Sequence, residues 1–305
     1  MRTGVGGPFL FMKLQGIFPA LTTSFDYEGH LYQAKITHNI HKLNEINLSG
    51  YVVCGSTGEA PLLGMDERIQ LMRWVREASA EGKILIAGVG CESVHETVRL
   101  SDRAAEAGYH VALVLTPHYY RGQMHRPEAQ ALFFRAVADR SKLPVMLYNL
   151  PQATGYSLSP ETVADLSHHP NIIGIKDSSG NLDNLRAIVN AAKPGFQVLS
   201  GSGINFCEAM NSGATGAILA IANPLPYACL TIWEALRMRQ IEAAEDWQQR
   251  IFGAAKTIAE KHGIPGLKHA MDLNGYYGGP PRLPFIPPSN AAKREIEAAF
   301  DGLKS

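Results

Sequence analysis

Two apolar segments of the chain end in side chains that could perform amine and proton-transfer chemistry. One runs directly into Lys176, and the segment one β-α-β step earlier ends at Tyr148. Burial disfavours the ammonium form of a lysine, and a neutral amine can attack a ketone to form a Schiff base. A phenol on the neighbouring strand, about 4.8 Å away, could shuttle protons during that reaction. The alternatives are structural: the lysine could extend to solvent or pair with Asp177, and the tyrosine could belong to the core.

A glycine-flanked turn supplies a third set of functional groups. The sequence Cys54-Gly55-Ser56-Thr57-Gly58-Glu59 follows another apolar run. Its hydroxyls and backbone N–H groups face one small volume, which suits a carboxylate. The turn lacks the lysine and the spacing of a phosphate-binding P-loop. Taken alone, it could also be an ordinary tight turn.

Eight short apolar runs alternate with longer segments of helical periodicity. The runs are nearly continuous rather than alternating, as in parallel strands that are buried on both faces. Their number and order predict an α/β protein, a (β/α)8 TIM barrel, in which reactive residues belong at the carboxyl ends of strands. The open doubly wound sheet is less favoured, because Phe206 stands where a dinucleotide fingerprint needs its third glycine. The runs are Gly16–Thr23, Gly50–Cys54, Ile84–Val89, Val111–Leu115, Val145–Leu150, Ile172–Ile175, Phe196–Leu199 and Ala217–Ile221.

The sequence after the eighth run predicts helices. Three segments have helical periodicity, and a stretch rich in glycine and proline, Gly275 to Pro288, separates the last two. We therefore predict a catalytic barrel over residues 14–224 and a C-terminal helical extension over residues 225–305, packed on the barrel. The three segments are Leu225–Met238, Gln240–His262 and Lys293–Leu303.

Composition narrows the class of function. The chain has 305 residues, 46% of them apolar, with 28 Lys+Arg against 28 Asp+Glu. A net charge of +0 provides no global field for nucleic acid or an anionic membrane. The apolar stretch Ala209 to Trp233 is interrupted by asparagines and prolines, and Pro8–Met12 is too short for a signal peptide. We expect a soluble protein without nucleic-acid or membrane partners.

Cysteine and histidine spacing predicts neither a disulfide framework nor a metal site. The four cysteines lie far apart without a CxxC pair, which indicates small buried side chains in a reducing compartment, and we predict a cytoplasmic protein. His95-Glu96 begins like a zinc motif, but Arg99 occupies the position of the second histidine. We therefore expect no metal and no cofactor.

Taken together, the motifs resemble the dihydrodipicolinate synthase/N-acetylneuraminate lyase family of pyruvate-handling class I aldolases. The resemblance runs from about Gly16 to Tyr277. It implies a TIM barrel, a homotetramer built as a dimer of dimers, and a Schiff base between Lys176 and pyruvate or another 2-oxo acid. The motifs that carry it are the Gly55–Glu59 turn, Thr116-Pro117 with Tyr119, Tyr148-Asn149-x-Pro151 and Gly174-x-Lys176-Asp177-Ser178.

The resemblance also implies roles for other residues. Tyr148 would be the proton donor and acceptor, and Thr57 would hold the 2-oxo acid carboxylate. Ser56 and Tyr119 would complete a hydroxyl relay, with Tyr119 reaching the partner subunit's site, although by itself its aromatic loop suggests an interface. The backbone at Gly201 and Ile218 would line the pyruvate pocket.

The second substrate is an aldehyde whose identity the motifs constrain less. Dihydrodipicolinate synthases commonly carry an arginine where this chain has Ala153. Other stretches, such as Thr116 to Gly122 and His262 to Lys268, are similar to the 4-hydroxy-2-oxoglutarate aldolase branch, in which Ser178 is expected near the second carboxylate. We favour cleavage of 4-hydroxy-2-oxoglutarate to pyruvate and glyoxylate. The alternatives are condensation of pyruvate with aspartate semialdehyde, cleavage of 2-keto-3-deoxy sugar acids, and pyruvate binding by a regulator without turnover.

Overall fold

The computed structural model describes residues 12–303, so most of the N-terminal stretch considered above as a signal peptide lies outside them. Eight parallel strands follow one another around a ring in the order β1-β8-β7-β6-β5-β4-β3-β2. A parallel bridge between Ala20 and Val52 joins the two ends of this sheet and closes the barrel. The predicted TIM barrel is confirmed, and the open doubly wound sheet is wrong.

All eight predicted runs form strands, with ends shifted by a few residues. The strands are β1 (Gly16–Pro19), β2 (Gly50–Val53), β3 (Ile84–Gly88), β4 (Val111–Leu115), β5 (Val145–Asn149), β6 (Ile172–Asp177), β7 (Gln197–Ser200) and β8 (Gly216–Leu219). The largest extension is in β6, which continues past Ile175 to Asp177 because the backbone pairing with β5 and β7 persists there. Lys176 therefore lies within a strand, where its direction is fixed by the pleat.

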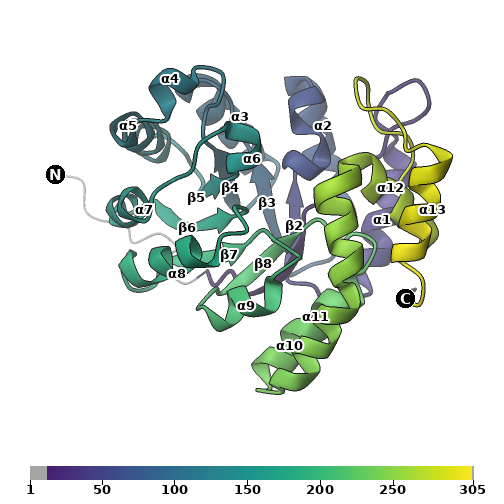
Figure 1. Ribbon diagram of the computed structural model, residues 1–305. Coiled ribbons are helices and arrows are strands. Elements are labelled where there is room, and N and C mark those ends of the chain that lie inside the picture. The colour runs from purple at the N-terminus through teal and green to yellow at the C-terminus, as the bar shows by residue number, and fades with distance from the viewer. Residues whose placement is uncertain (1–11, 304–305) are drawn as a thin grey trace.

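Helices cover the outside of the barrel and follow the strands in turn (Figure 1). At α7 the hydroxyl of Ser159 accepts a hydrogen bond from the backbone N–H of Thr162, as expected of an N-cap serine before a proline. The helices up to β8 are α1 (Gln33–Asn44), α2 (Met65–Ala78), α3 (Val94–Glu106), α4 (Arg121–Met124), α5 (Pro127–Ala138), α6 (Pro151–Thr154), α7 (Pro160–Ser167), α8 (Leu182–Ala191) and α9 (Phe206–Asn211).

The C-terminal segment differs from its prediction in one element. The helices are α10 (Pro226–Arg237), α11 (Ile241–Lys256), α12 (Gly263–Leu273) and α13 (Asn290–Ala299), and a π-helical turn over Thr257–His262 joins α11 to α12. Helix α12 was not predicted, because Gly263, Pro265 and Gly266 read as helix breakers. Pro265 lies in the first turn, where a helix does not use its backbone N–H. The boundary between residues 224 and 225 stays a prediction, and α10 contacts β1 as well as α11.

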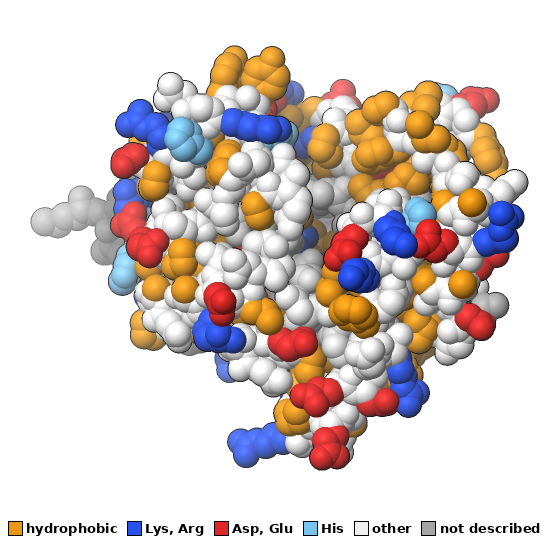
Figure 2. Space-filling model, viewed as in Figure 1, with side chains coloured by type: hydrophobic (Ala, Val, Ile, Leu, Met, Phe, Trp, Pro, Cys, Tyr) orange, Lys and Arg blue, Asp and Glu red, His pale blue; other side chains and the backbone are white. Residues whose placement is uncertain are grey.

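Two apolar layers hold the strands. Inside the ring, side chains such as Phe18, Ile86 and Met146 pack against one another, and Tyr148 belongs to this inner cluster. A larger cluster fills the space between the strands and the helices. On the face shown in Figure 2, acidic and basic side chains are interspersed. Among residues 12–303, no helix has both the length and the apolarity that a bilayer span requires.

Candidate active site

Lys176 and Tyr148 lie side by side at the carboxyl ends of neighbouring strands. The two residues are directly paired in the parallel register of β5 and β6. Only 3% of Lys176 and 5% of Tyr148 is exposed, and the Lys176 Nζ atom lies 4.2 Å from the centre of the Tyr148 ring. An amine and a phenol are thus held together in a site that admits little water, which is the arrangement predicted from their spacing.

The surroundings of the Tyr148 phenol favour proton transfer by lowering its pKa. Its hydroxyl donates to the Ser56 Oγ atom at 3.4 Å. Burial by itself would raise the pKa of Tyr148, but the charge of Lys176 and the polar side chains of Ser56 and Ser178 near the hydroxyl outweigh it and hold the pKa below the ordinary value of 10.0. A phenol with a lowered pKa exchanges its proton more readily near neutral pH.

The Asp177 side chain contacts other residues and does not pair with Lys176. Successive residues of a strand point to opposite faces, so the side chains of Lys176 and Asp177 diverge. The Asp177 carboxylate accepts hydrogen bonds from the Asn149 side-chain amide at 2.8 Å and from the Ser179 hydroxyl at 3.0 Å. These bonds tie the ends of β5 and β6 together and fix the loop that begins at Ser178.

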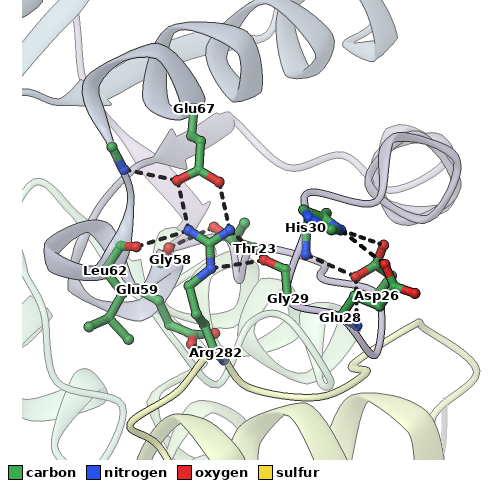
Figure 3. A network of polar contacts seen from close by, with 11 residues as sticks. Thr23, Asp26, Glu28, Gly29, His30, Gly58, Glu59, Leu62, Glu67 and Arg282 are labelled. Atoms are coloured by element: carbon green, nitrogen blue, oxygen red, sulfur yellow. Dashed lines mark hydrogen bonds and ion pairs between the residues drawn. The ribbon is translucent and has the colours of Figure 1, made fainter.

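The turn after β2 brings two hydroxyls to the same end of the barrel. Ser56–Gly58 forms the short 3-10 helix η2, and Ser56 and Thr57 are both half-buried. The Thr23 hydroxyl donates to the Gly58 carbonyl at 2.6 Å and so ties the turn to the loop that follows β1 (Figure 3). The turn therefore presents its hydroxyls from a fixed backbone.

A cavity of about 600 Å³ opens between these elements. Ser178 and Gly201 face Lys176 closely: a Cβ atom on Gly201 would lie 1.8 Å from the Ser178 Oγ atom and 3.1 Å from the Lys176 Cε atom. A larger residue than glycine at 201 would therefore displace the Ser178 side chain and crowd Lys176. Every predicted site residue except Tyr119 lines this cavity: Ser56, Thr57, Tyr148, Lys176, Ser178, Gly201 and Ile218.

Tyr119 lies outside the cavity of its own chain. It follows β4, is 77% exposed and stacks edge-to-face on Tyr120 with 5.1 Å between ring centres. Its backbone N–H donates to the Glu92 carboxylate at 3.0 Å, which fixes the loop. Within one subunit, this tyrosine takes no part in the arrangement around Lys176.

Sequence reasoning missed one wall of the cavity. The π-helical turn and the start of α12 contribute Ile258, Ala259, Glu260, Ile264 and Leu267 to its lining. These residues come from the extension that was predicted to pack on the barrel, and none of them was predicted as a site residue. The similarity of the His262 to Lys268 stretch to an aldolase branch was the one available signal.

Comparison with known proteins points to the family that the motifs resemble, over almost the whole chain. The model of the dihydrodipicolinate synthetase family matches residues 13–302. A 4-hydroxy-tetrahydrodipicolinate synthase of Methanothrix thermoacetophila is 35% identical, with 92% of this chain and 94% of that protein covered. A probable mitochondrial 4-hydroxy-2-oxoglutarate aldolase of Emericella nidulans is also 35% identical, with 93% of each covered.

The solved structures agree with the sequence comparisons. The crystal structure of the dihydrodipicolinate synthase DapA-2 from Bacillus anthracis superposes with a TM-score of 0.91 at 26% identity, covering 97% of this chain and 100% of that one. The match of fold, sequence and family model spans both the barrel and the C-terminal helices. The chain therefore belongs to the dihydrodipicolinate synthetase family and is a carbon–carbon lyase of the class I aldolase type.

Proposed function

We propose that this protein cleaves 4-hydroxy-2-oxoglutarate reversibly to pyruvate and glyoxylate through a Schiff base on Lys176. The observation that carries the proposal is the buried Lys176 amine beside the Tyr148 phenol, in a cavity rimmed by hydroxyls. The name of the Emericella nidulans relative supports the choice of substrate.

The reaction follows from these groups. The Lys176 amine attacks the C2 ketone, and loss of water from the carbinolamine gives an iminium ion. Tyr148, relayed through Ser56, takes the proton of the 4-hydroxyl group while the C3–C4 bond breaks, releasing glyoxylate and leaving an enamine. Protonation of the enamine and hydrolysis of the iminium release pyruvate and restore the amine. Thr57 would hold the C1 carboxylate throughout.

The position of the hydroxyls favours a short acidic aldehyde. In glyoxylate the carboxylate is bonded directly to the aldehyde carbon, so it must be held close to the reacting centre, where Ser56 and Ser178 lie. In aspartate semialdehyde two further carbons separate the aldehyde from the carboxylate, which therefore needs an anchor farther out. Lys176 is the only cationic side chain among the residues that line the cavity, and Ala153 is exposed on α6. Losing a charge-assisted contact costs about 1.5–3 kcal/mol, roughly ten- to a hundredfold in affinity.

Condensation of pyruvate with aspartate semialdehyde is the second candidate, because relatives named for that synthase also match the chain. A side-by-side assay separates the two reactions. We expect kcat/KM for cleavage of 4-hydroxy-2-oxoglutarate to exceed that for the condensation. An Ala153→Arg variant, which supplies a guanidinium, should gain condensation activity relative to cleavage. A higher kcat/KM for condensation in the unmodified protein would overturn the choice of substrate.

We also infer that the protein assembles as a homotetramer in which Tyr119 of one subunit completes the relay in another. Its exposure on the loop after β4 supports this inference, because an exposed aromatic side chain is available to a second copy. A monomer at assay concentration with full activity would contradict it.

A further inference from the structure

A buried ion pair lies behind the Ser56–Thr57 turn and takes no part in the chemistry described above. The Lys268 Nζ atom on α12 is 2.6 Å from the Glu59 Oε1 atom, and the two residues are 0% and 1% exposed. Burial lowers the pKa of Lys268, which the charge of Glu59 opposes. Because two charges must be stripped of water, such a pair seldom stabilises a fold more than apolar residues of similar volume. Stabilisation of the fold is therefore a weak explanation for the presence of this ion pair.

The pair joins segments that are distant in sequence. The second carboxylate oxygen of Glu59 accepts the backbone N–H of Arg282 at 2.8 Å, and the Lys268 ammonium also donates to the Pro280 carbonyl at 2.9 Å. Both cationic groups pack over the Phe25 ring, with Lys268 Nζ at 4.6 Å and Arg282 Cζ at 4.4 Å from its centre. The loop after β1, the turn after β2 and the C-terminal segment thus meet at Glu59.

The Arg282 side chain extends the same junction (Figure 3). It binds the two oxygens of the Glu67 carboxylate at 2.7 and 2.6 Å, and it donates to the Leu62 carbonyl at 2.9 Å. Such a bidentate contact fixes the orientation of the two side chains as well as their distance. The stretch between α12 and α13 is therefore locked onto the residues that follow the turn.

Both members of the pair belong to segments that form the cavity. Glu59 directly follows the short helix that carries Ser56 and Thr57, and Lys268 is the neighbour in sequence of Leu267, which also lines the cavity. Glu59 has a φ of 57° and a ψ of 30°, a left-handed conformation that is unfavourable for a residue with a side chain. The contact to Lys268 holds that residue, and hence the end of the turn, in this conformation.

We propose that the Glu59–Lys268 pair is a positioning device that sets the Ser56–Thr57 turn for the 2-oxo acid carboxylate and so makes the C-terminal helices part of substrate recognition. The inference rests on the proposed function, in which Thr57 binds that carboxylate. Neither Glu59 nor Lys268 touches the substrate in this scheme. Lys176 and Tyr148 are held by β5 and β6, so loss of the pair weakens binding of the 2-oxo acid without removing the reactive amine.

The test uses trapping of the pyruvate adduct with borohydride in the full-length protein. Lys268→Met alone leaves a buried carboxylate without its partner and can fail to fold, so the main variant is the double substitution Glu59→Gln with Lys268→Met. Glu59→Gln alone is the second variant, because its amide keeps the shape and an acceptor oxygen for Arg282. Tyr51→Phe is the matched control: it removes a hydrogen bond to Asn44 from the same strand, β2, without touching the turn.

We expect both variants to need about tenfold more pyruvate for half-maximal trapping, the scale of a weakened contact to a charged group. The adduct at saturation should stay at one per subunit, and the control should trap as the wild type does. If either folded variant reaches half-maximal trapping at the wild-type pyruvate concentration, the positioning role is overturned. An equal shift of that concentration in Tyr51→Phe would also overturn it, because it would indicate a general loosening of the fold. Absence of an adduct in the wild-type protein would instead refute the proposed function.

Discussion

Replacing Tyr148 by phenylalanine removes one oxygen atom from the centre of the proposed mechanism. The hydroxyl donates to Ser56 at 3.4 Å, which is long for such a bond, and the ring packs in the inner core of the barrel. Phenylalanine keeps the ring, so only a weak neutral hydrogen bond is lost, worth about 0.5 kcal/mol of the free energy of unfolding. The Tyr148→Phe variant should therefore fold normally.

The effect on catalysis should be far larger than the effect on stability. A positioned acid or base contributes about 10²–10⁴ in rate. That range corresponds to about 2.7–5.4 kcal/mol of activation free energy at 1.36 kcal/mol per factor of ten. We expect kcat for pyruvate release to fall within this range, while borohydride still traps pyruvate on Lys176, because the amine and its surroundings remain.

The pH profile provides an independent readout for the same variant. The pKa of Tyr148 lies below 10.0, so the phenolate that takes the proton of the 4-hydroxyl group should form at a lower pH than for an ordinary tyrosine. The wild-type kcat for cleavage should rise on the alkaline side with an apparent pKa under that value, and the Phe variant should lack this rise. An unchanged kcat, or the same alkaline rise in both proteins, would remove Tyr148 from the mechanism.

Three further predictions follow from the geometry. Borohydride with pyruvate should add one adduct per subunit, and peptide mapping should place it on Lys176; a label on another residue would refute the site. Tyr119→Phe should slow turnover if the relay crosses subunits, and wild-type kcat in that variant would count against the crossing. The hydrogen bonds from Arg282 lower the pKa of Glu67 below 4.5, so this carboxylate stabilises the fold above pH 4.5 and loses that effect as the pH falls through its lowered pKa. Since Glu67 is about one-third exposed, Glu67→Gln should cost only about 1 kcal/mol of unfolding free energy at pH 7 and progressively less in acid, as denaturant titrations can measure; a cost independent of pH would contradict the assignment.

The barrel could be predicted because local pattern and tertiary environment agree along most of the chain. Strands buried on both faces need continuous apolar runs, and all eight runs are visible in the sequence. In β6 the apolar run itself stops at Ile175, but Lys176 and Asp177 were also expected at the end of this strand, and their pairing with β5 and β7 confirms it. The length of an apolar run therefore gives only a lower limit for the length of a strand.

Helix α12 shows the opposite case, in which local signals mislead. Gly266 packs against the preceding turn so closely that a Cβ atom would lie 2.4 Å from the His262 Cβ atom. Glycine at this position therefore permits a close approach rather than ending a helix. The sequence alone does not distinguish these two uses of glycine.

The amino-acid sequence by itself determined the barrel, the family resemblance and the pairing of Lys176 with Tyr148, because consecutive parallel strands place residues at equivalent positions side by side. Only the tertiary structure decided that the start of α12 forms a wall of the cavity and that Lys268 reaches Glu59 behind the Ser56–Thr57 turn. Those contacts join residues far apart in the chain, and their formation depends on how the C-terminal helices pack across the barrel mouth, which no local periodicity encodes.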